Sequence, residues 1–85
     1  MTRNTFTFLP SDSTFKANID VADSMTRIAR LTSRVSIQLD GSTWVHGDTI
    51  RLMEYRHGDR IRIGEKGKEQ RFDIERITEV RVWLG

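Results

Sequence analysis

The chain has 85 residues, of which 36% are hydrophobic and 31% are charged, and its formal net charge is +2. This composition predicts one globular domain over residues 1–85 and excludes a disordered chain, while the absence of cysteine excludes disulfides and cysteine-ligated metal centres. No segment has the pattern of a signal peptide or the ~20 apolar residues of a membrane span, so we expect a cytoplasmic protein without membrane association.

The first half of the chain predicts a strand, a helix and a hairpin. Residues 4–9 alternate polar and apolar side chains, which predicts a strand. From Asp20 to Thr32 apolar residues recur at helical spacing, with acidic residues at the start and arginines toward the end, as the helix dipole favours. Residues 35–39 alternate before Asp40-Gly41, a strong hairpin signal, so we expect the returning strand at residues 42–45.

The second half of the chain predicts a short helix, a strand and a loop, followed by an ambiguous segment. Residues 48–55 predict a short helix, with Asp48 in the position of its N-cap. The alternation at residues 60–63 predicts a strand, and the polar residues 65–69 predict a loop. Residues 72–84 leave two alternatives open, because their apolar spacing fits a helix whereas their β-branched alternation fits a strand.

Several features match one known family in chain order. They are the alternating Val35-x-Ile37-x-Leu39, Gly41 at a hairpin, Ile50-x-Leu52-Met53, Gly58-Asp59-x-Ile61-x-Ile63, and Ile74 and Ile77 near the end. In this order the chain resembles HPr, the histidine-containing phosphocarrier of the bacterial sugar phosphotransferase system. The resemblance implies an α+β open-faced sandwich, a four-stranded antiparallel sheet with about three helices on one face. It favours a helix over residues 72–84.

The residue that carries the family's chemistry is missing from this chain. The phosphocarrier needs a histidine at the start of the first helix, and the corresponding positions here are Lys16, Ala17 and Asn18. Asp20 and Asp23 add negative charge that would repel a phosphate near that helix start. We therefore expect no phosphocarrier activity, no other enzymatic activity and no cofactor.

The family's second functional position is a regulatory serine at the start of the short helix, and it falls on Asp48. Two interpretations stay open for this residue. Asp48 either only caps the helix through a hydrogen bond to a backbone N–H, or its carboxylate imitates the phosphate that relatives carry.

The leading functional hypothesis is a non-catalytic protein-binding or regulatory module whose partner is another protein. It rests on the family, whose members present the short helix to their partners, since a fold alone does not fix a function. The expected docking surface consists of Ile50, Arg51, Leu52 and Met53.

Two alternatives come from other classes. The first is a small nucleic-acid-binding domain that sets a basic face against phosphates, formed by Arg27, Arg30, Arg34, Arg51, Arg56, Arg60 and Arg62. The second is a phage-type structural or assembly subunit in which residues 80–84 add a strand to a neighbour's sheet.

The remaining residues of interest are histidines and tryptophans. His46 and His57 are the only histidines, which is too few for a metal site of three or four ligands, so we expect no bound metal. We expect Trp44 and Trp83 to pack in the core, with a partly exposed ring as the hint of a partner surface.

Overall fold

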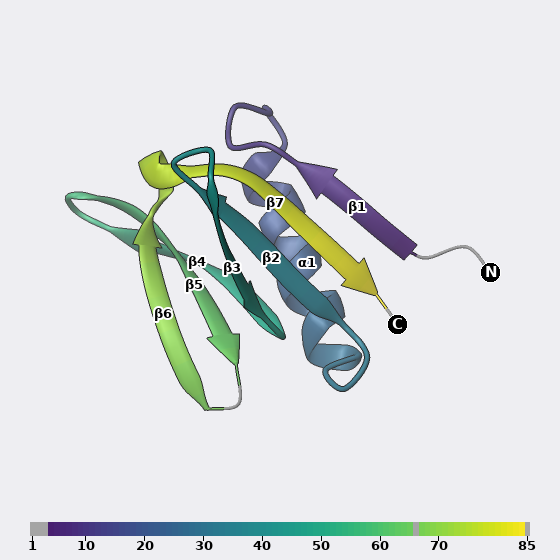
Figure 1. Cartoon of the computed structure of the whole chain (residues 1–85). Coiled ribbons are helices and arrows are strands. Elements are labelled where there is room, and N and C mark those ends of the chain that lie inside the picture. The colour runs from purple at the N-terminus through teal and green to yellow at the C-terminus, as the bar shows by residue number, and fades with distance from the viewer. Residues whose placement is uncertain (1–3, 66, 85) are drawn as a thin grey trace.

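The computed structural model describes residues 4–65 and 67–84, which form two small antiparallel sheets and one helix longer than a single turn (Figure 1). Sheet A has the strand order β1-β7-β2-β3, and sheet B has the order β4-β5-β6. The elements are β1 (Asn4–Phe8), α1 (Phe15–Ile28), β2 (Arg34–Leu39), β3 (Thr43–Gly47), β4 (Thr49–Tyr55), β5 (Gly58–Glu65), β6 (Lys68–Asp73), the 3₁₀ turn η1 (Ile74–Arg76) and β7 (Ile77–Leu84).

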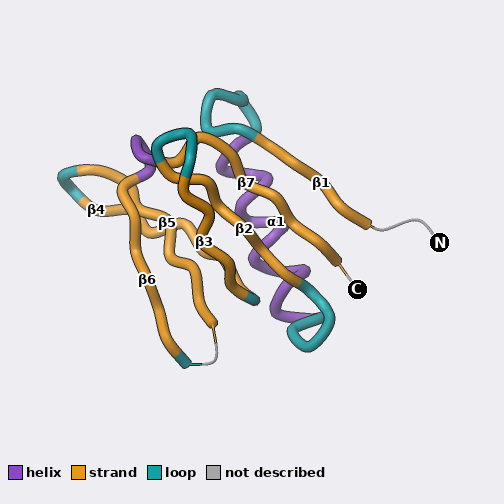
Figure 2. The backbone as a smooth tube through the Cα atoms, viewed as in Figure 1, coloured by secondary structure: helices purple, strands orange, loops and turns teal. Residues whose placement is uncertain are grey.

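The expected sandwich of four strands with three helices is therefore wrong, because the described residues are mostly β. Figure 2 shows α1 behind sheet A, with strands making up most of the remaining chain. The predicted short helix at residues 48–55 is strand β4, and the ambiguous residues 72–84 form the end of β6, η1 and the strand β7. In both segments the apolar residues alternate with polar ones, as in a strand. This alternation places Ile50 of β4 and both Val80 and Val82 of β7 in the core.

The hairpin predicted around Asp40-Gly41 is confirmed. Strands β2 and β3 pair antiparallel, and Leu39 lies opposite Thr43. Asp40 and Gly41 have φ angles of 54° and 74°, the left-handed conformation that such tight turns require. The carboxylate of Asp40 also accepts a hydrogen bond from Arg76, which raises the pKa of the Arg76 guanidinium and ties the hairpin to η1.

Helix α1 begins earlier than the sequence indicated, at Phe15 instead of Asp20. Its buried positions are Phe15, Ile19, Ala22 and Thr26, one face of a helix at the spacing of core contacts. Asp20 consequently lies beyond the first turn, so the expected repulsion of a phosphate at the helix start is wrong. The helix also ends at Ile28, and the residues up to 32 form turns.

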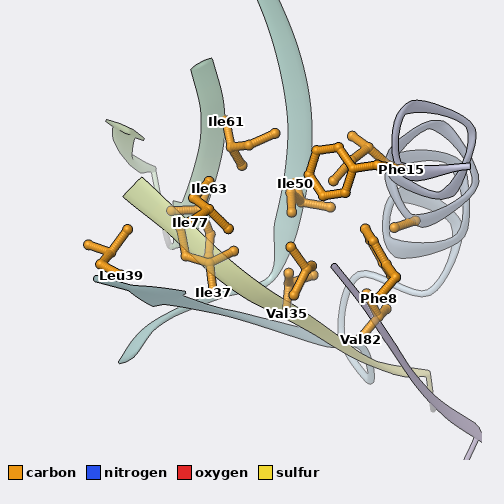
Figure 3. Close-up of a cluster of buried hydrophobic side chains, with 13 residues drawn as sticks. Phe8, Phe15, Val35, Ile37, Leu39, Ile50, Ile61, Ile63, Ile77 and Val82 are labelled. Atoms are coloured by element: carbon orange, nitrogen blue, oxygen red, sulfur yellow. The ribbon is translucent and has the colours of Figure 1, made fainter. Parts of the chain in front are cut away.

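The core lies between the two sheets and α1 (Figure 3). Sheet A contributes Val35 and Ile37, and sheet B contributes Ile50, Ile61 and Ile63, all of them almost fully buried. Helix α1 packs beside β4, an edge strand of sheet B, and so limits the access of other strands to that edge.

The two sheets meet where β3 passes into β4, with only Asp48 between them. Gly47 is buried there, and a Cβ atom on it would lie 2.6 Å from the carbonyl oxygen of Gly64. The N–H of Asp48 donates to the same oxygen over 2.8 Å. The two backbones therefore approach each other closely at the junction of the two sheets.

Candidate anion-binding pocket

Three arginines form a row straight across sheet B. Arg51 of β4 lies opposite Arg62 of β5, which in turn lies opposite Arg71 of β6. Because Ile50, Ile61 and Ile63 point into the core, alternation places this arginine row on the outward face of the sheet. Like charges directly opposite each other destabilise a sheet. The row is therefore a local concentration of positive charge that a bound anion would relieve.

Helix α1 and the turn after it bring two further arginines to one end of this row. Arg27 and Arg30 meet Arg51 and Arg62 around a cavity of about 350 Å³. Thr49 supplies a hydroxyl, and the buried Ile50 forms an apolar part of the wall. We call this cavity the arginine pocket; its lining residues are Arg27, Arg30, Thr49, Ile50, Arg51 and Arg62.

Three carboxylates partly neutralise these arginines. Asp23 accepts from Nε of Arg27 at 2.7 Å, and Asp48 lies 3.9 Å from Nε of Arg30. Glu69 lies 3.6 Å from Arg62 and 3.9 Å from Arg71, so one carboxylate is shared between two guanidinium groups. Within residues 4–65 and 67–84, no carboxylate lies within 4.0 Å of Arg51.

The chemistry of the pocket suits binding of an oxyanion. Guanidinium groups keep their charge at any physiological pH and present several N–H donors in a plane that matches phosphate or carboxylate oxygens. The titratable side chains of the lining are all arginines, which do not exchange protons in proteins. The lining therefore offers several N–H donors that match an anion, and its titratable side chains are arginines.

The structure gathers part of the predicted basic face. Arg27, Arg30, Arg51 and Arg62 come together, whereas the others lie elsewhere. Arg60 is on the same face of sheet B but is paired with Asp73 at 3.0 Å, Arg56 lies in the β4–β5 turn, and Arg34 begins β2 in sheet A. Arg71 was not predicted, because residues 70 and 71 lie between the predicted loop at residues 65–69 and the ambiguous segment at residues 72–84 and were assigned to no element.

The residues of the expected docking surface do not share one face. Ile50 is only 1% exposed and belongs to the core, and Leu52 packs against the core from the same side of β4. Arg51 and Met53 alternate with them toward the opposite side. The prediction placed the four residues on a helix. In a strand, successive side chains point to opposite faces of the sheet, so the four residues cannot form one surface.

Asp48 caps no helix, because β4 stands where the short helix was expected. Its two functional interpretations both depended on that helix, so neither describes the observed residue. The other family position lies in the first turn of α1. There Lys16 pairs with Asp59 at 3.4 Å, and the side-chain amide of Asn18 donates to Thr14. Ala17 between them is exposed.

The two histidines lie in separate parts of the fold. Nδ1 of His46 is 2.5 Å from the buried hydroxyl of Ser36, whereas His57 stacks on Tyr55 in the β4–β5 hairpin. The described ranges contain no group of three side chains able to hold a metal ion. Across the same ranges, no helix has the length and apolar character needed to cross a membrane.

Comparison with protein-family models, curated proteins and solved structures gives no match, so any assignment of function rests on the geometry of the arginine pocket.

Proposed function

We propose that the chain is a non-catalytic nucleic-acid-binding module that holds backbone phosphates in the arginine pocket. The observation that carries the proposal is the cross-strand row of Arg51, Arg62 and Arg71, joined at one end by the helix arginines. Charge-assisted hydrogen bonds from guanidinium groups to phosphate are among the strongest polar contacts available to a protein surface.

A polyanion fits this arrangement better than one small anion. Neighbouring strands lie about 4.8 Å apart, so a row over three strands extends about 10 Å. The pocket encloses one end of the row, and Arg71 lies beyond it on β6. Successive phosphates of a nucleic acid backbone are the natural ligand for positive charge spread over that length.

The assembly alternative loses its structural basis. Residues 80–84 were expected to add a strand to a neighbour's sheet, but β7 is paired on both sides, with β1 and with β2. The backbone N–H and C=O groups of β7 are therefore already paired with β1 and β2.

Removing two pocket arginines is the direct test. We expect the combined Arg51→Ala and Arg62→Ala variant to bind a labelled single-stranded oligonucleotide at least tenfold more weakly at low salt. The slope of log affinity against log salt concentration should flatten by about 0.7 for each phosphate that the variant no longer neutralises. Fluorescence anisotropy over a salt series measures both quantities.

Arg56→Ala is the matched control, since it removes an exposed arginine from the turn at the other end of β4. We expect it to change neither affinity nor salt slope by more than about a factor of two. Equal losses in the control and the pocket variant would refute a specific pocket, and wild-type protein without affinity for oligonucleotides would refute the proposed function.

Asp48→Asn should strengthen binding. The carboxylate of Asp48 lies 3.9 Å from Arg30 and competes with a phosphate for that guanidinium. Exposed ion pairs contribute roughly 0.2–1 kcal/mol, so we expect the variant to bind about 1.5- to 5-fold more tightly. The backbone N–H that donates to Gly64 remains in asparagine, and a thermal melt should show an unchanged fold. Weaker binding by a folded variant would contradict this prediction.

A further inference from the structure

The outward face of sheet A is uncovered in the described structure. Val35 and Ile37 point from this sheet into the core, and α1 lies behind the sheet in the view of Figure 1. The alternate residues therefore form the opposite, outward face. They include both tryptophans of the chain, Trp44 on β3 and Trp83 on β7, together with Arg34 on β2.

The two tryptophans have different surroundings. The guanidinium carbon of Arg81 lies 4.7 Å from the centre of the Trp44 ring, so one face of that ring already has a cationic partner. Trp83 is half-buried, and its cross-strand neighbours are Thr5 on β1 and Arg34 on β2. Among the described residues, no aromatic ring or cation stacks on Trp83. Trp83 is consequently the tryptophan of this face that has no stacking partner among the described residues.

Arg34 is close in sequence to the arginine pocket. It follows Arg30 by four residues, and Arg30 lines the pocket while Arg34 begins β2 directly opposite Trp83. One short turn of the chain therefore separates a pocket arginine from Arg34, which is the sheet partner of Trp83. Arg34 is exposed and has no carboxylate within 4.0 Å in residues 4–65 and 67–84, so its charge is available to a phosphate.

We infer that the nucleic acid is single-stranded, with an unpaired base stacked on Trp83 and an adjacent phosphate bound by Arg34. This inference rests on the proposed function and names its substrate class. A flat aromatic ring beside positive charge is the combination that binds single strands with little sequence preference. In a duplex the base faces are stacked on each other and are closed to such a ring.

The first experiment compares an oligothymidylate of about 12 nucleotides with a duplex of the same length by anisotropy at one salt concentration. We expect wild-type protein to bind the single strand at least tenfold more tightly. Trp83→Leu should weaken single-strand binding about 5- to 150-fold and leave duplex binding unchanged. Trp83→Phe keeps an aromatic ring and should retain most of the affinity, which separates lost stacking from a damaged fold.

The Trp44→Leu variant serves as control and as probe. We expect its affinity to stay within about threefold of wild type, because Arg81 already lies over one face of the Trp44 ring. With Trp83 as its sole tryptophan, its fluorescence should be quenched by bound oligothymidylate.

The outcomes separate this inference from the proposed function. Equal affinity for single strand and duplex, no quenching in the Trp44→Leu variant, or equal losses in the two leucine variants each overturn the assignment of Trp83 while the arginine pocket stands. Absence of binding to either oligonucleotide overturns both proposals together.

Discussion

Ile50→Ala is expected to lower the free energy of unfolding by about 2–5 kcal/mol, the usual cost of removing a large side chain from a packed core. Ile50 is 1% exposed, lies opposite Ile63 on β5 and packs near α1 (Figure 3). A domain of this length has a total stability of roughly 4–13 kcal/mol. The variant should therefore lose a large share of its stability and unfold at a clearly lower urea concentration than wild type, as a urea titration followed by circular dichroism would show.

Met53→Ala is the matched control, because both residues belong to β4 and both were predicted to form one docking surface. Met53 is half-buried and lies outside the core cluster, so we expect it to cost roughly 1 kcal/mol or less. If the two variants unfolded at the same urea concentration, the placement of Ile50 in the core would be wrong.

Gly47→Ala is expected to lower the free energy of unfolding by about 1–3 kcal/mol or more through overpacking. The new Cβ atom would lie 2.6 Å from the backbone oxygen of Gly64 and 2.6 Å from Cγ1 of Ile63. Relief requires the two sheets to move apart, which would also lengthen the hydrogen bond from Asp48 to Gly64. Thermal and urea unfolding of the variant measure the cost.

Gly64→Ala offers a control at the same junction. A Cβ atom there meets the hydroxyl oxygen of Thr49 at 2.8 Å, a side-chain atom that can turn away. We expect this variant to lose less than about 1 kcal/mol. A larger loss at Gly64 than at Gly47 would show that backbone contact at the sheet junction is not the limiting feature.

Local alternation and turn chemistry predicted the elements whose partners are close in sequence. The β2–β3 hairpin followed from Asp40-Gly41 and the residues on either side, since the turn geometry specifies the pairing. The strand at residues 60–63 was also predicted, although β5 extends over Gly58–Glu65. Of the predicted polar loop at residues 65–69, Lys66 lies outside the described residues, and Lys68 begins β6.

The errors arose where a short alternating segment also fits a helix. Residues 48–55 begin with an aspartate after a glycine, which is typical of a helix N-cap, but Ile50 and Leu52 lie two positions apart and face one core. The resemblance to HPr added weight to helices at these residues and near the end of the chain. In the structure, β4 pairs with β5, and β7 pairs with β1 and β2, so both segments are strands.

The candidate site was only partly predictable, because it depends on cross-strand register. Arg51 and Arg62 are eleven positions apart in the sequence, and nothing in their spacing shows that they face each other. The register follows from the turn at Arg56 and His57, but β4 was assigned to a helix, so this turn was not read as a hairpin. Once β4 and β5 are paired strands, the arginine row follows from alternation alone.

The position of β7 between β1 and β2 has a consequence for how the chain folds. Sheet B consists of consecutive hairpins, whereas β7, an inner strand of sheet A, is the last described strand in chain order and must insert between two earlier ones. Ile77, Val80 and Val82 of that strand complete the core. A ribosome-bound chain in which β7 is not yet synthesised lacks the strand that pairs with both β1 and β2, so sheet A can close only after residues 77–84 have been synthesised.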